Sequence, residues 1–152
     1  GAGAFQQALE ALCIHLARAM ARDAEGANHL LEVTVEGAAT QTEARRAART
    51  IAGSPLVKAA VHGADPNWGR ILAALGRSGV QLREDRIELY LEQMCLFREG
   101  RPQPFSEREA SRLMARPEVA FLVRLSLGPG QATAWGCDLS EEYVTINSDY
   151  TT

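Results

Sequence analysis

The chain has 152 residues, of which 46% are hydrophobic and 23% are charged, and its formal net charge is −3. This composition is typical of a globular domain with a substantial core and excludes extensive disorder. The 16 basic residues are scattered, so nothing favours nucleic-acid binding. No apolar run approaches the ~20 residues of a membrane span, and no signal-peptide pattern is visible, so we expect a cytoplasmic protein without a membrane segment.

In the first half of the chain, the apolar spacing predicts alternating helices and strands. Residues 5–22 repeat at helical period, and residues 30–36 alternate between apolar and polar side chains as in a half-buried strand. Thr40 or Thr42 can cap a helix over residues 43–51. The apolar run at residues 56–61 predicts a short buried strand.

The second half continues this mixture of elements. Four segments carry helix or strand signals: a helix at 71–76, a strand at 87–91, a pairing strand at 94–97, and a helix ending near 115 that Ser106 caps. Residues 119–127 and 131–138 predict two strands of a hairpin, joined by Gly-Pro-Gly. We therefore predict one α/β (α+β) domain over residues 1–152, layered, with a mostly antiparallel mixed sheet packed with helices.

The cysteines and the amino terminus limit the possible kinds of protein. Cys13, Cys95 and Cys137 form no Cys-x-x-Cys pair, which favours buried free thiols over disulfides or a zinc site. We expect neither a metal nor a cofactor. The chain begins with Gly-Ala-Gly-Ala and no Met, which suggests a processed chain or a fragment.

The turn at residues 62–70 is the densest cluster of polar and turn-forming residues. Asp65 is predicted to cap the next helix, with Pro66 in its first turn. Arg70 could bind a carboxylate through a two-point contact. The structural alternative is that Asp65 only caps, Trp68 packs and Arg70 pairs at the surface.

Glu25 and the carboxy-terminal tail are the other candidate binding residues. Glu25 follows a predicted helix end, where the helix dipole disfavours a carboxylate, so it either holds a cation such as an amine or is a solvated loop residue. The tail, residues 143–152, combines apolar side chains with the polar groups of Asn147 and Thr152. It is either a binding segment or a docked structural tail. The common nucleophile and phosphate-binding motifs are absent from the sequence.

Two long segments resemble the ornithine acetyltransferase (glutamate N-acetyltransferase) family, ArgJ. The first is residues 54–79, which include His-Gly-Ala-Asp-Pro-Asn-Trp-Gly-Arg, and the second is the tail from residue 132 to residue 152. A looser similarity covers residues 22–28. The resemblance extends from about Phe5 to the last residue and implies the carboxy-terminal part of the family's β chain, with a DmpA/ArgJ-like fold.

The resemblance also implies a reaction. Family members are made as a precursor that cleaves itself before an internal threonine, and the new amino-terminal hydroxyl takes the acetyl group of N2-acetylornithine. Glutamate then collects it, in a ping-pong cycle of arginine biosynthesis. The cleavage site is expected upstream of Gly1, so we expect no catalytic residue here and no activity without the α chain. The implied assembly is a heterotetramer of two α and two β chains.

Three substrate-binding residues are carried over by the resemblance: Glu25, Asn147 and Thr152. The carboxylate suits an amine, while the amide and the hydroxyl suit an amino-acid head group. Ala24 replaces the family's usual glycine, which leaves the carboxylate but alters the turn. The alternatives are an amino-terminal-nucleophile amidohydrolase of related fold and a non-catalytic assembly domain.

Overall fold

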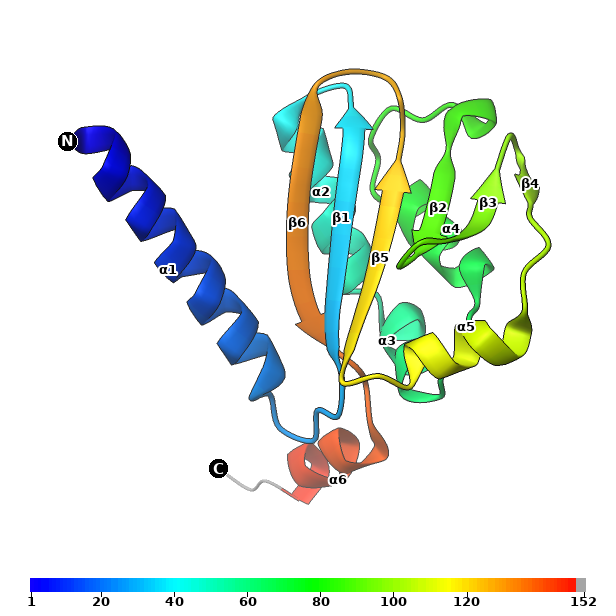
Figure 1. Ribbon diagram of the computed structural model, residues 1–152. Helices are drawn as coiled ribbons and strands as arrows, with labels where there is room; N and C mark the ends of the chain where they lie inside the picture. The colour runs from blue at the N-terminus through cyan, green and yellow to red at the C-terminus, as the bar shows by residue number, and fades with distance from the viewer. Residues whose placement is uncertain (150–152) are drawn as a thin grey trace.

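One mixed sheet organises the computed structural model, which describes residues 1–149 (Figure 1). Its strands are β1 (Leu30–Ala38), β2 (Glu88–Leu91), β3 (Met94–Arg98), β4 (Arg101–Pro102), β5 (Glu118–Arg124) and β6 (Gly130–Cys137). Their order across the sheet is β4-β3-β2-β5-β1-β6. Strands β1 and β5 pair in parallel and the other four pairings are antiparallel, which confirms the predicted α/β class with a mostly antiparallel mixed sheet.

The helices are unequally distributed around the sheet. They are α1 (Ala2–Arg22), α2 (Gln41–Ala52), α3 (Pro55–His62), α4 (Trp68–Arg77), α5 (Glu107–Met114) and α6 (Glu141–Asp149), with a 3-10 turn η1 (Glu84–Arg86). Helices α2, α3 and α4 cover one face, while α6 lies beyond the end of β6 (Figure 1). Helix α1 stands beside the β6 edge and approaches the body mainly through its carboxy-terminal end.

The core lies between the sheet and α2. Strand β1 contributes to it through alternate side chains, as the sequence predicts. Leu31, Val33 and Val35 are fully buried, whereas the side chains between them point to the other face. Helix α2 presents four buried alanines and Ile51 to the sheet, and its small side chains permit a close approach to β6. The predicted cap is confirmed, since Thr40 Oγ1 accepts a hydrogen bond of 3.1 Å from Glu43 N–H.

The predicted strand at residues 56–61 is wrong, because this segment is helix α3. Its buried residues are Val57, Ala60 and Val61, a spacing of three and four that suits one helical face. Pro55 occupies the first helical turn, where its missing N–H costs no hydrogen bond. The following helix α4 is capped by Asn67 rather than by the predicted Asp65: Asn67 Oδ1 accepts from Arg70 N–H at 3.2 Å.

The predicted hairpin of β5 and β6 is also wrong, because β1 lies between them. Strand β1 pairs with β5 on one side and with β6 on the other. The Gly-Pro-Gly connection therefore crosses the end of β1. Gly128 and Gly130 lie so close to the backbone of residues 38–40 that a Cβ at either position would collide with carbonyl oxygens.

Helix α1 is amphipathic, as predicted, but none of its residues is buried. Phe5 is 71% exposed and Met20 is 76% exposed, and Leu9, Leu12 and Leu16 are about half exposed. Cys13 on this helix is exposed too, contrary to the expected burial of the thiols. Over residues 1–149, none of the helices has both the length and the apolar character to span a bilayer.

Candidate functional site

Glu25 lies in the turn that joins α1 to β1. The turn begins after Asp23, which caps α1, and it contains a hydrogen bond of 3.0 Å from Ala27 N–H to the carbonyl of Ala24. Gly26 adopts a φ of +69°, a conformation that strongly favours glycine. The side chain of Glu25 is exposed, so its carboxylate is free to meet a ligand from solvent.

Asp138 holds the second half of this turn from the end of β6. Its carboxylate is completely buried, and Oδ1 accepts from the backbone N–H groups of Asn28 at 2.8 Å and His29 at 2.9 Å. Oδ2 lies 2.9 Å from Nδ1 of His62 on α3. Burial alone would raise the pKa of this carboxyl, but the hydrogen bonds from His29, His62 and Asn28 outweigh burial and lower the pKa.

Ser140 connects the same turn to helix α6. Its hydroxyl donates to the carbonyl of Gly26 at 2.5 Å and accepts from Tyr143 N–H at 3.1 Å, as an N-cap does. Gly26 packs directly on this helix start, because a Cβ there would lie 2.6 Å from the nitrogen of Tyr143. The turn that carries Glu25 and the first turn of α6 are therefore in contact.

Asn147 lies on α6, so the structure brings its segment to the same end of the molecule as Glu25. Its Nδ2 donates to the carbonyl of Tyr143 at 2.8 Å, and the side chain is exposed. Tyr143 thus contacts Gly26 on one side and Asn147 on the other. Thr152, the third predicted binding residue, lies outside the described residues.

The residues of the 62–70 turn have mainly structural contacts. The ring of Trp68 packs on Phe97, with centroids 5.7 Å apart, and Arg70 Nη1 donates to the carbonyl of Leu56 at 3.1 Å. Asp65 accepts from Asn67 Nδ2 at 3.2 Å. Trp68 and Asp65 also line a surface pocket with Phe105 and with two residues of α5, Glu107 and Ser111. Within residues 1–149, no group of three or more His, Cys, Asp or Glu side chains is placed to hold a metal.

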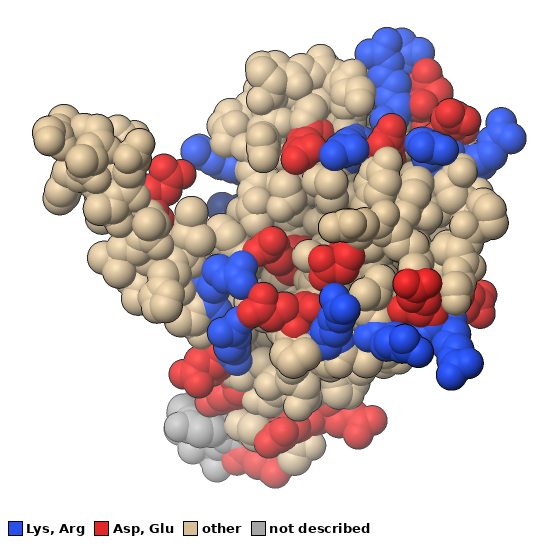
Figure 2. Space-filling model, in the orientation of Figure 1, with Lys and Arg blue, Asp and Glu red and all other residues tan. Residues whose placement is uncertain are grey.

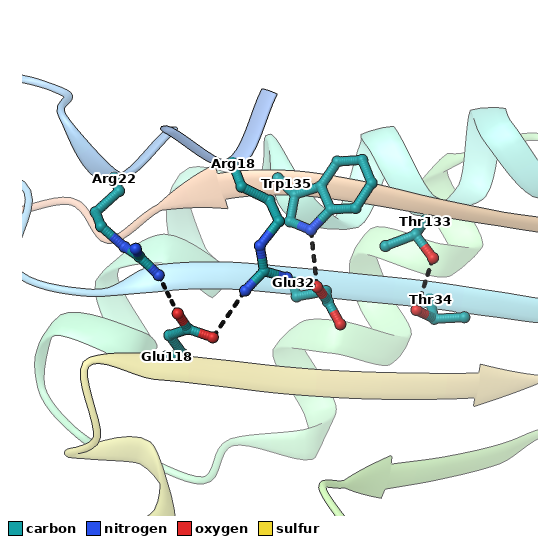
Figure 3. Close-up of polar contacts among 7 residues, drawn as sticks. All are labelled: Arg18, Arg22, Glu32, Thr34, Glu118, Thr133 and Trp135. Atoms are coloured by element: carbon teal, nitrogen blue, oxygen red, sulfur yellow. Dashed lines mark hydrogen bonds and ion pairs between the residues drawn. The ribbon is translucent and has the colours of Figure 1, made fainter. Parts of the chain in front are cut away.

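The carboxy-terminal end of α1 is fixed to the open face of the sheet by charged residues (Figure 3). Arg18 reaches Glu32 on β1 at 2.6 Å and Glu118 at 2.9 Å, and Arg22 also pairs with Glu118. Trp135 on β6 donates from Nε1 to Glu32 at 2.8 Å. These contacts fix the point at which the Glu25 turn leaves α1.

The whole chain matches one protein family. The model of the ArgJ family matches residues 1–152. The chain belongs to the ArgJ family. The arginine biosynthesis bifunctional protein ArgJ of Dehalococcoides mccartyi is 55% identical over 148 residues, which are 97% of this chain and 36% of that protein. The ArgJ of Symbiobacterium thermophilum is 53% identical over 149 residues, or 98% of this chain and 37% of that protein.

A solved structure of the family has the same fold. The crystal structure of the arginine biosynthesis bifunctional protein ArgJ from Bacillus halodurans superposes with a TM-score of 0.94 at 43% identity, covering 97% of this chain and 70% of that one. The ArgJ family assignment and the sheet topology therefore agree. The chain spans only about 36% of the length of the curated ArgJ relatives that it matches.

Sequence reasoning missed the two residues that organise this end of the molecule, Asp138 and Ser140. A cap signal was present for Ser140, because a serine followed by Glu141 and Glu142 is typical of a helix start. No local pattern indicates the role of Asp138, since its partners are more than 70 residues away in the chain.

Proposed function

We propose that this chain is the carboxy-terminal part of a glutamate N-acetyltransferase, an enzyme that moves an acetyl group from N2-acetylornithine to glutamate in arginine biosynthesis. The observation that carries this proposal is the match of the ArgJ family over all 152 residues. The contact between the Glu25 turn and α6 supports it further, because two of the proposed substrate-binding segments lie together.

In this proposal, Glu25, Asn147 and Thr152 form one wall of the substrate cavity. The exposed carboxylate of Glu25 binds an amine of N2-acetylornithine, and Asn147 and Thr152 orient the amino-acid head group. Acidic side chains gather around α6 at this end of the molecule (Figure 2). Their negative potential favours the approach of a substrate that carries an amine.

The acetyl group is accepted by a threonine that we place in a part of the protein outside this chain. Autocatalytic cleavage of a precursor would expose that threonine as an amino terminus, and its own amine would activate the hydroxyl. Acetylation of the threonine releases ornithine, and attack by glutamate then regenerates the free hydroxyl in a ping-pong cycle. We infer that the reaction takes place in the cytoplasm, and that this chain needs neither metal nor cofactor for it.

We further propose that the α chain of the same precursor covers the apolar face of α1, in a heterotetramer of two α and two β chains. Figure 2 shows α1 as an arm of almost entirely uncharged surface. Large apolar side chains left in solvent are typical of an interaction surface. The curated relatives are long enough to supply the covering chain, since this one spans about 36% of their length.

The catalytic proposal is tested in the full-length protein with Glu25→Gln. We expect kcat/KM for N2-acetylornithine to fall more than tenfold, a loss of about 1.4 kcal/mol or more in transition-state stabilisation. The control is Glu84→Gln, which neutralises an exposed carboxylate on η1. Equal kinetics of the two variants would remove Glu25 from the substrate site.

The assembly proposal is tested by co-expressing the α chain with variants of α1 and measuring the mass of the purified complex. Leu12→Gln should weaken co-purification of the two chains because it places an amide in the apolar interface. Gln7→Ser on the same helix is the control. Full assembly of the Leu12 variant would mean that another surface holds the chains together.

A further inference from the structure

The connector from β6 to α6 holds the Glu25 turn at two points. Asp138 accepts hydrogen bonds from Asn28 N–H and His29 N–H, and Ser140 donates one to the carbonyl of Gly26. The N–H of Asp138 also donates to the carbonyl of His29 at 3.2 Å. We refer to the side chains of Asp138 and Ser140 as the connector clamp.

The burial of the connector clamp shows that these bonds are strong constraints. The side chain of Asp138 is inaccessible to solvent, and Ser140 is 4% exposed. A buried carboxylate is tolerated only when it is well hydrogen-bonded, and each of its partners would in turn be left unsatisfied without it. The carboxylate therefore fixes the backbone of Asn28 and His29, three and four residues after Glu25.

The same clamp fixes the helix that carries Asn147. Ser140 caps α6 through Tyr143 N–H, and the carbonyl of Tyr143 accepts the amide of Asn147. The clamp is itself anchored to the body, because Leu139 N–H donates to the carbonyl of Lys58 at 3.2 Å and His62 bonds to Asp138. One connector of three residues thus determines where both substrate-binding segments lie.

We propose that Asp138 and Ser140 are positioning residues for substrate binding: they set the place of Glu25 relative to Asn147 without touching the substrate. This inference rests on the proposed function, since it assumes that Glu25 binds N2-acetylornithine. Asp138 acts through the turn backbone, Ser140 acts through Gly26 and the start of α6, and His62 holds the second oxygen of Asp138 in place.

The clamp predicts different outcomes for two substitutions at Asp138. In Asp138→Ala, both backbone N–H groups lose their acceptor, so the turn is released. In Asp138→Asn, Oδ1 can still accept from Asn28 and His29, so the turn remains held. Because the loss of this acceptor would also lower stability, the cycle with Glu25→Gln is what distinguishes a positioning role from a general loss of stability.

The experiment is a double-mutant cycle in the full-length protein, measuring kcat/KM for N2-acetylornithine. We expect Asp138→Ala to lower kcat/KM at least tenfold, and Asp138→Asn to recover most of the activity. In the Glu25→Gln background, Asp138→Ala should lower kcat/KM less than threefold further. The Glu25 carboxylate is already absent there, so releasing the turn can no longer displace it. If Asp138→Ala yields no folded protein, Ser140→Ala takes its place in the same cycle.

The control is Ser78→Ala, which removes another buried hydroxyl, one that donates to the carbonyl of Leu75 at the end of α4. It should leave kcat/KM unchanged in both backgrounds. Suppose that Glu25→Gln lowers kcat/KM, and that the fold-loss of the double variant equals the product of the two single-variant losses. The clamp then does not act through Glu25, and this inference is wrong. If Glu25→Gln alone has no effect, the proposed substrate site is wrong, and the inference fails with it.

Discussion

Ser140 donates a hydrogen bond of 2.5 Å to the carbonyl oxygen of Gly26, across 114 positions of sequence. The bond joins the turn after the first helix to the start of the last one. Because Glu25 precedes Gly26 directly, the side chain with the clearest proposed role is placed by a residue near the other end of the chain. The proposed site is thus a product of the tertiary fold rather than of a local motif.

Gly26→Ala should destabilise the fold more than the same change at another left-handed glycine. Gly26 and Gly79 have nearly equal φ values, +69° and +70°, so each substitution costs about 1–2 kcal/mol of backbone strain. At Gly26, the new Cβ would also lie 2.6 Å from Tyr143 N, whereas Gly79 has open space. Crowding adds roughly 1–3 kcal/mol at Gly26. Urea denaturation measures both losses, and equal losses would contradict the close packing of the turn on α6.

The elements that were predicted correctly are those specified locally. Helix α2 has a threonine cap and an apolar face within twelve residues, and both appear in the structure. The run at residues 56–61 has too few polar residues to show a period, so a buried strand and a buried helix look alike there. Pro55 was the signal that favoured a helix start.

Strand order and the clamp were beyond local reasoning for a different physical reason. Strands β5 and β6 are adjacent in sequence, yet each pairs with β1. Strand β1 takes this central place because its inward side chains complete the core between the sheet and α2. Asp138 likewise lies beside Asn28 because β6 pairs with β1. The sequence could place Glu25 at a helix end, but it could not show that the Glu25 turn contacts the start of α6.

Glu118→Gln should loosen α1 while leaving the body of the chain nearly as stable. Glu118 pairs with both Arg18 and Arg22, whereas Glu32 pairs with Arg18 alone, and α1 has no buried residues. Because the pairs are exposed, the global free energy of unfolding should change by less than about 1 kcal/mol. Hydrogen exchange in the 152-residue chain should nevertheless become faster along α1.

The control for this change is Asp85→Asn, which removes the exposed Arg83–Asp85 pair far from α1. It should leave exchange along α1 unchanged. Raising the salt concentration should reproduce part of the Glu118 effect, since exposed ion pairs are screened. Unaltered exchange in the Glu118 variant would mean that the remaining Arg18–Glu32 pair is sufficient to hold α1.

Two further glycines should respond to alanine with opposite signs. A Cβ at Gly130 would collide with the backbone carbonyl of Thr40, so Gly130→Ala should destabilise the chain by roughly 2–3 kcal/mol. Gly76 is an exposed residue in the last turn of α4 with open space around it, so Gly76→Ala should stabilise the chain by about 0.5–1 kcal/mol. Thermal melting distinguishes the two. A tolerated alanine at residue 130 would show that α2 does not pack closely on the β6 end.

The contribution of Asp138 to the free energy of unfolding should decrease as the pH falls. Its folded pKa lies below the unfolded value of about 3.9, because the hydrogen bonds from His29, His62 and Asn28 outweigh the cost of burial. The ionised group therefore stabilises the fold above that value, and the contribution is lost as the pH falls through the folded pKa. The difference in unfolding free energy between the native chain and Asp138→Asn should shrink from pH 5 to pH 3.

The role of His62 in this effect is tested by repeating the comparison in a His62→Ala background. Without the imidazole, the carboxyl loses one of the hydrogen bonds that lower its pKa, so its folded pKa moves closer to the unfolded value. The pH-dependent part of the stability difference between pH 5 and pH 3 should become smaller. Urea midpoints at each pH provide the measurement. A difference that stays constant, or grows as the pH falls, would mean that the ionised carboxylate does not hold the turn.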